Sequence, residues 1–550
     1  MKNMEKMRSK IRVGLILDSF DVPIWTYYLI KKLKESDYIT ISDIIYNSKS
    51  ISKKNMENLV IQKAKKKTNW LLNLYEKYER KRINLVEDLI DSKNCKKILE
   101  EILMEKEIHK TRECNEFSDN IINEQLKKYD LDVIINLSFK NISESMLNRS
   151  RFGVWSYRCM NNSDKIDMTG FWEVYENRPV TCTILEMLKE KNDIKVIDLS
   201  FSFTDHLYFL KNRMNQNWKK TIMIPRKLKK MYENDEESVF EYDDVGNFYN
   251  NECYTPTNIQ VLNFFARHVQ KYFKIKKKYS HKIEQWGLLF YLKQKDPQLQ
   301  KGFQKIIPPN DRFYADPFIV KRDDIYFVFI EEFLYGQNKG HISYLKINQD
   351  GEYSEPKKIL ECPYHMSYPF IFKFKNEYYM IPETSENKSI DLYKCTKFPD
   401  EWEFVKSIMK NFVALDSTIL EKDGKWWLFT SSPEMNESPN DTLYLFHSDD
   451  LLNGEWISHP KNPIISDVRK ARSAGKLFEI ENKFYRPGQD CSIGYGRGIR
   501  FNLIKTLNEK NYEELTFGTI YSQDKEIEGI HTYSKDDDLT VFDFKILIDK

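Results

Sequence analysis

The chain has 550 residues, of which 31% are charged and 14% aromatic, and its 86 lysines and arginines nearly balance 83 aspartates and glutamates. This length allows two or three domains with separate cores, and a net charge of +3 makes no case for a nucleic-acid-binding protein. The eight cysteines form no C-x-x-C pair, which excludes the common zinc modules.

No segment has the pattern of a leader or of a membrane-spanning helix. The first apolar run, Ile11–Leu17, is too short for the core of a signal peptide and has no small-residue cleavage site after it. No run approaches the roughly 18 apolar residues that a spanning helix needs. We therefore expect reduced cysteines and a cytoplasmic location, with peripheral contact at the inner membrane face as a further expectation.

The N-terminal half begins with a strand–helix–strand pattern. Ile11–Leu17 is continuously apolar, which is typical of a buried parallel strand, and residues 24–33 and 38–46 predict a helix and a second strand. No G-x-G-x-x-G follows the first strand, so a dinucleotide site is not indicated. Residues 53–128 are charged and predict a helical insertion, in which the lysines of 63–67 form a solvated helix face.

The α/β pattern returns over residues 131–157, with strands at 131–137 and 153–157 around a helix at 143–148. A basic helix is predicted over 205–232 and another over 258–272, separated by an acidic linker at 233–244. Lysines gather at both helix ends. Cations at helix C-termini are the plainer explanation, and contact with an anionic membrane or a lipid-linked phosphate is the alternative.

The C-terminal half repeats one hairpin pattern five times. Each repeat has an apolar run, a polar turn and a second run rich in aromatic and β-branched residues, which predicts a β-hairpin. Equivalent positions advance by 52, 48, 58 and 56 residues through Tyr326, Tyr378, Trp426, Phe484 and Thr540. A period near fifty without helices is typical of a β-propeller. The fifth repeat ends after about three strands, so we expect residues 285–292 to close a five-bladed ring.

Carboxylates recur at equivalent positions of these repeats. Asp316, Tyr368 and Asp416 share the column where the innermost strands begin. Fifteen residues later stand Glu331, Glu383 and Ser431, where the second strand returns to the same face. Acids that converge in one hollow shift each other's pKa, which separates a proton donor from a base. The alternative is that each acid only caps a turn. We take as catalytic candidates Asp316, Asp416, Glu383 and Glu331.

The fourth repeat adds cations to this pattern. Arg469, Arg472 and Lys476 precede its inner strand, and Arg486 and Asp490 stand at its return. Guanidinium groups suit phosphates, which a donor with an activated sugar carries and a plain glycosidase substrate lacks. Pairing of these cations with nearby acids is the equal alternative. The substrate-binding candidates are Arg312, Glu332, His365, Tyr368, Arg469, Arg472, Arg486, Asp490 and His531.

Short motifs in this half carry a family resemblance. They include ADPF at 315–318, SYPF at 367–370, DVRKARSAG at 467–475 and YRPGQD at 485–490. From about 312 to 542 the chain resembles the propeller of plant glucosamine inositolphosphorylceramide transferases, a module that bacterial proteins carry behind a formyltransferase-like domain. The architecture is also similar to the furanosidase clan of arabinanases and invertases. That resemblance implies Asp316 as base or nucleophile, Asp416 as the orienting carboxylate, and Glu383 or Glu331 as the acid.

Residues 132–203 resemble the formyltransferase family, with 170–188 matching the segment around its substrate loop. The catalytic positions depart from the family: Ser156, Tyr157 and Arg158 stand where Asn-x-His is expected, and the turn at Asp193 lacks its glycine. Arginine cannot act as the imidazole base near neutral pH. We expect formyl transfer to be lost, leaving a ligand-binding, positioning or scaffolding domain.

The expected architecture is a formyltransferase-like, Rossmann-like α/β domain over 1–204, a helical connector over 205–280 and an all-β five-bladed propeller over 281–550. The expected function is glycosyl transfer in cell-surface polysaccharide or glycolipid biosynthesis, with the active site at the central mouth of the propeller. The partners would be a nucleotide- or phosphate-linked sugar donor and a glycan or lipid-linked acceptor, without nucleic acid, cofactor or metal. The alternatives are a furanoside hydrolase and a non-catalytic carbohydrate-binding protein.

Overall fold

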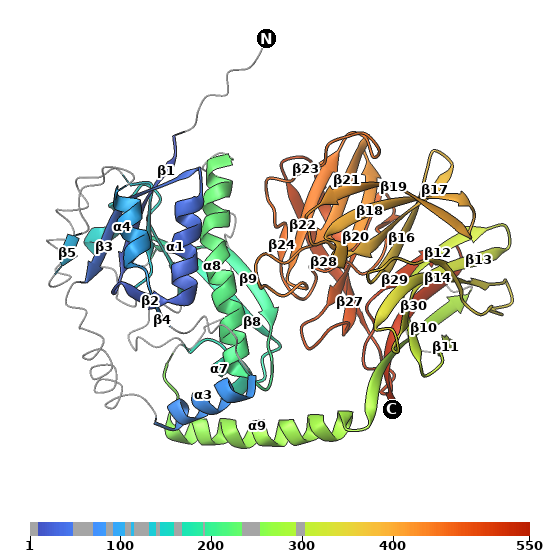
Figure 1. Ribbon diagram of the computed structural model, residues 1–550, viewed down its shortest axis with the longest axis horizontal. Coiled ribbons are helices and arrows are strands. Elements are labelled where there is room, and N and C mark those ends of the chain that lie inside the picture. Colours follow the sequence, from blue (N-terminus) through green and yellow to red (C-terminus); the bar gives the residue numbers. More distant parts are fainter. Residues whose placement is uncertain are drawn as a thin grey trace, which may run out of the picture. The chain divides into compact units, whose positions relative to one another are not determined.

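The computed structural model describes residues 9–47, 70–83, 92–104, 112–114, 131–138, 144–158, 168–190, 193–233, 254–292 and 303–550. The chain forms two compact units (Figure 1). Unit 1 contains residues 1–273 with 435–437, and unit 2 contains residues 274–434 and 438–550. Among the described residues, no helix is long and apolar enough to cross a membrane.

Unit 1 is built on a seven-stranded mixed sheet with the order β5-β3-β1-β6-β7-β8-β9. The pairings from β5 to β7 are parallel, and β8 and β9 add antiparallel strands at one edge. The continuous apolar runs explain the parallel part, because such strands are buried on both faces. The strands are β1 (Ile11–Leu17), β3 (Ile39–Asn47), β5 (Arg112–Cys114), β6 (Val133–Asn136), β7 (Val154–Tyr157), β8 (Val180–Glu190) and β9 (Asp193–Phe203).

Two helices, α1 (Ile24–Glu35) and α8 (Phe209–Glu233), pack on each other and on this sheet. The predicted strand–helix–strand opening is therefore present as β1, α1 and β3. The resemblance to formyltransferases stays a prediction, because a mixed sheet with helices does not identify that family. The other elements of this part are β2 (Asp21–Pro23), β4 (Ser92–Asn94), α3 (Trp70–Ile83), α4 (Lys96–Met104), α6 (Glu144–Leu147), α7 (Phe171–Tyr175) and α9 (Asn258–Tyr279).

Several predicted segments are described only in part. Of the helical insertion over 53–128, the described elements are α3, α4, β4 and β5. The lysine cluster at 63–67 and the linker after Glu233 lie outside the described residues. The predicted basic helix is α8, and it buries Lys219 and Lys220, so these two cations do not form an exposed basic surface.

Unit 2 contains five β-sheets, which form the five-bladed propeller that the repeat pattern predicted. We number the sheets as blades 1 to 5 in the order of their first hairpins. Blades 1 and 2 consist of β12 (Arg312–Arg322), β13 (Ile325–Leu334), β14 (Lys339–Ile347), β15 (Lys357–Leu360), β16 (Ser367–Phe374), β17 (Glu377–Thr384), β18 (Ser389–Lys397) and β19 (Glu401–Lys410).

The later blades vary in their strands. Blade 3 has a short extra strand paired with β22, and blade 5 combines the two ends of unit 2. Blades 3 to 5 consist of β20 (Leu415–Lys422), β21 (Lys425–Ser431), β22 (Thr442–Ser448), β23 (Ile457–Ser458), β24 (Ile465–Ser466), β25 (Phe478–Ile480), β26 (Lys483–Asp490), β27 (Gly498–Leu507), β28 (Tyr512–Tyr521), β29 (Tyr533–Asp536), β30 (Leu539–Asp549), β10 (Lys282–Leu292) and β11 (Gln304–Ile306).

The predicted N-terminal strand closes the ring, but the last blade takes two strands from that part of the chain instead of one. β10 pairs with β30 along its whole length, from Lys282 opposite Asp549 to Leu292 opposite Leu539. The last repeat supplies two strands rather than three, and β11 completes the sheet on the outer side of β10. The closure gives both strands a partner and removes an open edge from the ring.

Gly475 joins blades 4 and 5 at a point where no side chain fits. Gly475 and Tyr533 form an isolated β-bridge. The φ of Gly475 is +126°, and a Cβ at this position would lie 2.0 Å from the backbone oxygen of Tyr533. Gly424 also has a positive φ, +75°, but a Cβ there would meet nothing within 4 Å. Of these two glycines, Gly475 therefore combines a left-handed backbone with a steric clash, and Gly424 has the left-handed backbone alone.

We expect Gly475→Ala to lower the free energy of unfolding of the propeller by about 3 kcal/mol or more, because the backbone of the two blades must separate. Gly424→Ala, the control, is expected to cost only about 1 kcal/mol for its left-handed φ. Denaturant unfolding of the three proteins measures both changes. Equal losses in the two variants would show that the clash relaxes at no cost.

Candidate active site at the centre of the propeller

The innermost strands of blades 1 to 3 share a bulge with a left-handed residue. Asp316, Tyr368 and Asp416 have φ values of +52°, +44° and +48°. The hairpin register shifts at each of these positions. A non-glycine residue in this conformation costs about 1–2 kcal/mol, so surrounding contacts must hold it.

Those contacts are hydrogen bonds from the left-handed residues to carboxylates of the preceding blade. The backbone N–H of Asp316 donates to Asp543 Oδ2 at 3.0 Å, and that of Tyr368 donates to Asp316 Oδ2 at 3.2 Å. The backbone N–H of Asp416 donates to Glu383 Oε2 at 3.1 Å. These acids therefore fasten blade 5 to blade 1, blade 1 to blade 2, and blade 2 to blade 3.

His531 lies between two of these carboxylates. Its Nδ1 is 2.8 Å from Asp543 Oδ2, and its Nε2 is 3.3 Å from Asp316 Oδ1. Burial alone would lower the pKa of His531, but Asp543 and Asp316 raise it to about 10. Thr532 Oγ1 also donates to Asp316 Oδ1 at 2.8 Å. At neutral pH this group is an imidazolium held between two acids.

The same group also carries the donor types of a metal site. The ligand atoms of Asp316, His531 and Asp543 lie within 4.8 Å of one another, and no other such group occurs in the described part of the chain. Metal binding requires a neutral imidazole, whereas the two carboxylates favour the protonated ring. The donor set can therefore hold a proton on the ring or, once that proton is released, a cation.

Arg472 forms the second charged centre. Its Nε donates to Asp416 Oδ2 at 2.6 Å and its Nη2 to Asp416 Oδ1 at 3.3 Å, while the same Nη2 is 3.5 Å from Glu383 Oε2. Gln489 Nε2 donates to Asp416 Oδ2 at 2.8 Å. The guanidinium lies over the Tyr495 ring at 5.1 Å. Arg472 is therefore the predicted cation that contacts two of the predicted catalytic acids, Asp416 and Glu383.

The side chains of Glu331 and Glu383 have higher pKa values than an ordinary glutamate. Burial, followed by the charge of Asp316, raises the pKa of Glu331 well above its usual range. Burial and then Asp416 raise the pKa of Glu383 to about 8, against the opposing effect of Arg472. Both Asp316 and Asp416 act electrostatically on Glu331, so the four acids share one centre. The centre thus combines two glutamates of raised pKa with aspartates that are paired with cations.

Tyr368 and His365 line the same centre. The Tyr368 hydroxyl is 3.0 Å from Thr418 Oγ1 and accepts from the backbone N–H of Gly475 at 2.8 Å, so this buried ring spans between blades. His365 Nδ1 accepts from the backbone N–H of Gly340 at 3.0 Å, and its Nε2 is 3.5 Å from Glu331 Oε1. Burial lowers the pKa of His365. A neutral ring with this bond carries its proton on Nε2, facing Glu331.

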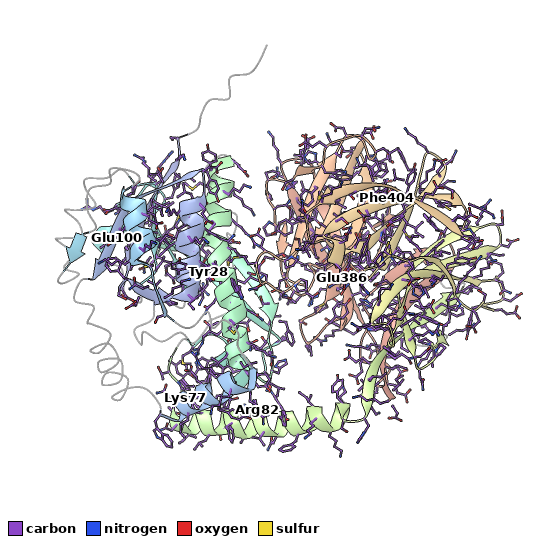
Figure 2. The ribbon with its side chains drawn as sticks, viewed as in Figure 1. Tyr28, Lys77, Arg82, Glu100, Glu386 and Phe404 are labelled. Carbon is purple, nitrogen blue, oxygen red and sulfur yellow. The ribbon has the colours of Figure 1, made fainter. Side chains whose placement is uncertain are left out.

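The loop that contains His365 is held by the turn after β17. The backbone N–H of His365 donates to Glu386 Oε2 at 3.0 Å. Glu386 is labelled in Figure 2 and lies in the propeller. This contact fixes the distance between the histidine and the carboxyl group of Glu331.

Arg312 and Glu332 bind each other rather than the central acids. Arg312 Nη1 donates to Glu332 Oε1 at 2.7 Å, and Glu332 Oε2 is 3.1 Å from His341 Nε2 and accepts from Ser343 Oγ at 2.7 Å. Burial would raise the pKa of Glu332, but hydrogen bonds from His341, Ser343 and Arg312 lower it to about 2. The alternation of a strand points Glu332 away from the side of Glu331. Both residues are among the predicted substrate ligands, and the structure pairs them with each other, away from the central acids.

Three other predicted ligands also have partners within the protein. Arg486 is buried and donates to both oxygens of Glu514 at 2.8 Å. Arg469 donates to both oxygens of Asp467, at 2.8 and 2.7 Å. Asp490 Oδ2 accepts from Arg500 at 2.9 Å and Tyr521 at 2.7 Å. The structure therefore brings Arg472 to the central acids but holds Arg469, Arg486 and Asp490 in other contacts.

Several residues of the centre are not among the candidates chosen from the sequence. Asp543, Gln489 and Tyr495 each contact it, and Tyr495 remains 38% exposed. Gln489 occupies the column of Glu331 in the fourth repeat, so the repeat alignment contained a signal for it. Asp543 falls two residues before that column, on the same face of its strand. Tyr495 lies in the loop between β26 and β27, outside the strands that the repeat pattern aligns.

The departures from the formyltransferase pattern have structural roles in unit 1. Arg158 Nε donates to Glu186 Oε1 at 2.5 Å, and the Glu186 side chain is buried. Asp193 is exposed at the start of β9. The loss of formyl transfer stays a prediction.

Comparison with known proteins concerns the propeller. Residues 304–537 match the family model described as glucosamine inositolphosphorylceramide transferase 1, N-terminal. The chain is 38% identical over 207 residues to glucosamine inositolphosphorylceramide transferase 1 of Oryza sativa subsp. japonica, which covers 37% of this chain and 28% of that protein. The relative of the same name from Arabidopsis thaliana is 35% identical over 213 residues, covering 38% and 27%. The match thus spans less than a third of the length of these relatives.

Solved structures with some similarity are glycoside hydrolases. A family 117 glycoside hydrolase of Zobellia galactanivorans has a TM-score of 0.33 and 10% identity, covering 48% of this chain and 90% of that one. An alpha-L-arabinofuranosidase of Podospora anserina has a TM-score of 0.33 and 11% identity, covering 44% and 94%. The blade assignment rests on the strand pairing of the present chain.

The raised pKa of Glu383 predicts a pH-dependent stability. Unfolded Glu383 loses its proton near its ordinary pKa of 4.5, whereas the folded side chain keeps it up to about 8. This contribution to stability is therefore present at low pH and is lost between about pH 5 and 8. Glu383→Gln keeps an oxygen for the Asp416 N–H but cannot ionise, so its melting temperature should fall less over this interval.

Thermal unfolding of both proteins between about pH 5 and 8 measures the difference in slope. His531, with its pKa raised to about 10, adds a loss of stability in the same direction at higher pH in both proteins. Identical slopes would contradict the protonated state assigned to Glu383.

We expect Arg486→Met to destabilise the propeller by about 3–5 kcal/mol, because Glu514 is left as a buried charge without its main partner. The control is Lys505→Met, which removes an exposed ion pair, 3.7 Å apart, between Lys505 of β27 and Glu513 of β28. Such surface pairs contribute about 0–1 kcal/mol. Denaturant unfolding compares the two losses, and similar values would contradict the structural role of Arg486.

Proposed function

We propose that the propeller binds a glycosyl group at its centre and transfers it to an acceptor during biosynthesis of a cell-surface polysaccharide or glycolipid. The observation that carries the proposal is the gathering of Glu331, Glu383, Asp316 and Asp416 in one buried centre, where the pKa of both glutamates is raised. Reaction at an anomeric carbon needs a proton donor and a carboxylate that stabilises positive charge, which is what this pairing offers.

The contacts suggest a role for each group. Glu331, which faces the Nε2–H of His365, donates a proton to the leaving oxygen. Asp316, held by His531 and Thr532, receives the proton of the acceptor hydroxyl. Asp416, which is paired with the Arg472 guanidinium, stabilises the oxocarbenium-like charge and positions Arg472.

Arg472 supports a phosphate-bearing donor. Its side chain is 12% exposed, and it carries a positive charge beside the acids. When a sugar phosphate bond breaks, negative charge grows on the leaving phosphate, and a guanidinium stabilises it. The matched relatives are named for glucosamine and inositolphosphorylceramide. Nucleotide-linked glucosamine donors and phosphorylated lipid acceptors are therefore the first substrates to test.

Hydrolysis remains the second candidate because the same acid and carboxylate also serve a glycosidase. With water as the acceptor, Asp316 would receive a proton from water instead of from a sugar or lipid hydroxyl. The use of a phosphate-linked donor separates the two reactions. A carbohydrate-binding protein without turnover is the third outcome.

We expect the full chain to release nucleoside diphosphate from a nucleotide sugar in the presence of a lipid acceptor, and Glu331→Gln to lower this rate on the order of 10²–10⁴-fold by removing the acid. The matched control is Glu421→Gln, the same substitution at an exposed position of β20. Chromatography of the nucleotide and glycolipid products measures transfer directly.

Other outcomes would redirect the assignment. Unchanged transfer by Glu331→Gln would remove that residue as the acid. Cleavage of furanosides without a phosphate-linked donor would identify a hydrolase. Sugar binding that persists in Asp316→Asn, in a wild-type protein without turnover, would identify a binding module.

A further inference from the structure

Helix α3 of unit 1 and helix α9, whose residues up to Phe273 belong to unit 1, carry large apolar side chains on their outer sides. The exposed fractions are between 37% and 71%. On each helix the spacing of three or four residues places these side chains along one stripe. We define the α3–α9 face by Trp70, Leu74, Tyr78, Ile259, Leu262 and Phe265.

The two stripes form one surface because the helices pack through a second set of residues. Tyr75 of α3 lies edge-on to Phe264 of α9 at 5.2 Å, and its hydroxyl is 3.0 Å from His268 Nδ1. Phe265 then contacts the rings of both Tyr75 and Tyr78, at 6.1 and 6.3 Å. The buried sides of α3 and α9 are therefore already occupied, and the exposed stripes meet at Phe265.

The acidic side chains of these helices point inward, and exposed side chains carry positive charge. The two acids of α3 face inward: Glu76 accepts from Arg213 Nη1 at 3.1 Å, and the buried Glu79 accepts from the backbone N–H of Leu210 at 3.0 Å. Lys77 and Arg82, labelled in Figure 2, are exposed on α3. All charged residues of α9 are cations, namely Arg267, Lys271, Lys274, Lys276, Lys277 and Lys278.

Aromatic and aliphatic side chains with a cationic border suit the interface of a membrane. Trp and Tyr favour the level of the headgroups, apolar side chains enter the acyl boundary, and lysines attract anionic lipids. A second copy of the chain fits less well, because two such faces would bring cations together. Scattered exposed apolar residues need no partner, whereas a joined apolar face indicates one.

We propose that the α3–α9 face binds the surface of a lipid bilayer that contains anionic lipids. Trp70, Leu74, Ile259 and Leu262 enter the interface, and Lys77 and Lys81 contact the headgroups. This interaction places unit 1 on the membrane without a spanning segment. It does not depend on the glycosyl transfer proposed for the propeller.

Co-sedimentation of the full chain with lipid vesicles tests this binding. Vesicles of phosphatidylcholine mixed with phosphatidylglycerol should bind the protein on the order of tenfold more strongly than phosphatidylcholine alone, and added salt should weaken the binding. Ile259→Ser with Leu262→Ser should reduce partitioning on the order of tenfold or more by removing apolar contact. Lys77→Glu with Lys81→Glu should reduce it to a similar degree by charge reversal.

A matched control is available on the propeller. Phe404 of β19 and Phe517 of β28 are 56% and 72% exposed, and Phe404 is labelled in Figure 2. Phe404→Ser with Phe517→Ser removes as much exposed apolar surface elsewhere and should leave vesicle binding unchanged. Melting temperatures of all variants confirm that each is folded. As a second measurement, vesicles should shift tryptophan fluorescence to the blue in the wild type and less in Trp70→Phe.

Three results would overturn the proposal. The first is no binding of the wild type to the mixed vesicles at low salt. The second is equal binding by the wild type and Ile259→Ser with Leu262→Ser. The third is a dimer in solution, detected by light scattering, that these substitutions break while vesicle binding persists. The transfer assay uses the propeller residues and can fail or succeed separately from this test.

Discussion

The propeller depends on a hydrogen bond between a left-handed residue of one blade and a carboxylate of the blade before it. Asp316, Tyr368 and Asp416 each donate this bond through the backbone N–H. Left-handed backbone is unfavourable for these residues, and the charged acceptor offsets that cost because such hydrogen bonds are the stronger kind. The acids that close the ring are also the acids that gather at its centre.

Gathering several carboxylates in a buried centre requires compensation of charge. The protein supplies His531 between Asp316 and Asp543, and Arg472 beside Asp416 and Glu383. Burial and the remaining repulsion from the aspartates raise the pKa of both glutamates. The acids that join the blades are thus also groups that can donate and accept protons. For this reason the centre is an active-site candidate.

Unit 1 contributes a different kind of property. Arg158 pairs with the buried Glu186, so this position contributes an ion pair to the packing of unit 1. The α3–α9 face carries apolar and cationic side chains on the outside of helices whose inner sides are already packed. A lipid-binding surface in one unit and a glycosyl-binding centre in the other would together suit an enzyme that acts on a lipid-linked acceptor.

The sequence by itself determined the five blades and the columns of acids, because hairpin turns and strand alternation are local patterns that repeat along the chain. It also indicated closure by an N-terminal strand. Only the tertiary structure decided which cation reaches the acids: Arg472 does, while Arg486 pairs with Glu514. Long-range contacts made through irregular loops determine which cation reaches the acids. Such contacts also place the Tyr495 ring against Arg472. The exposure of the α3–α9 face was likewise decided by packing, since an apolar helical stripe has the same periodicity whether it is covered or not.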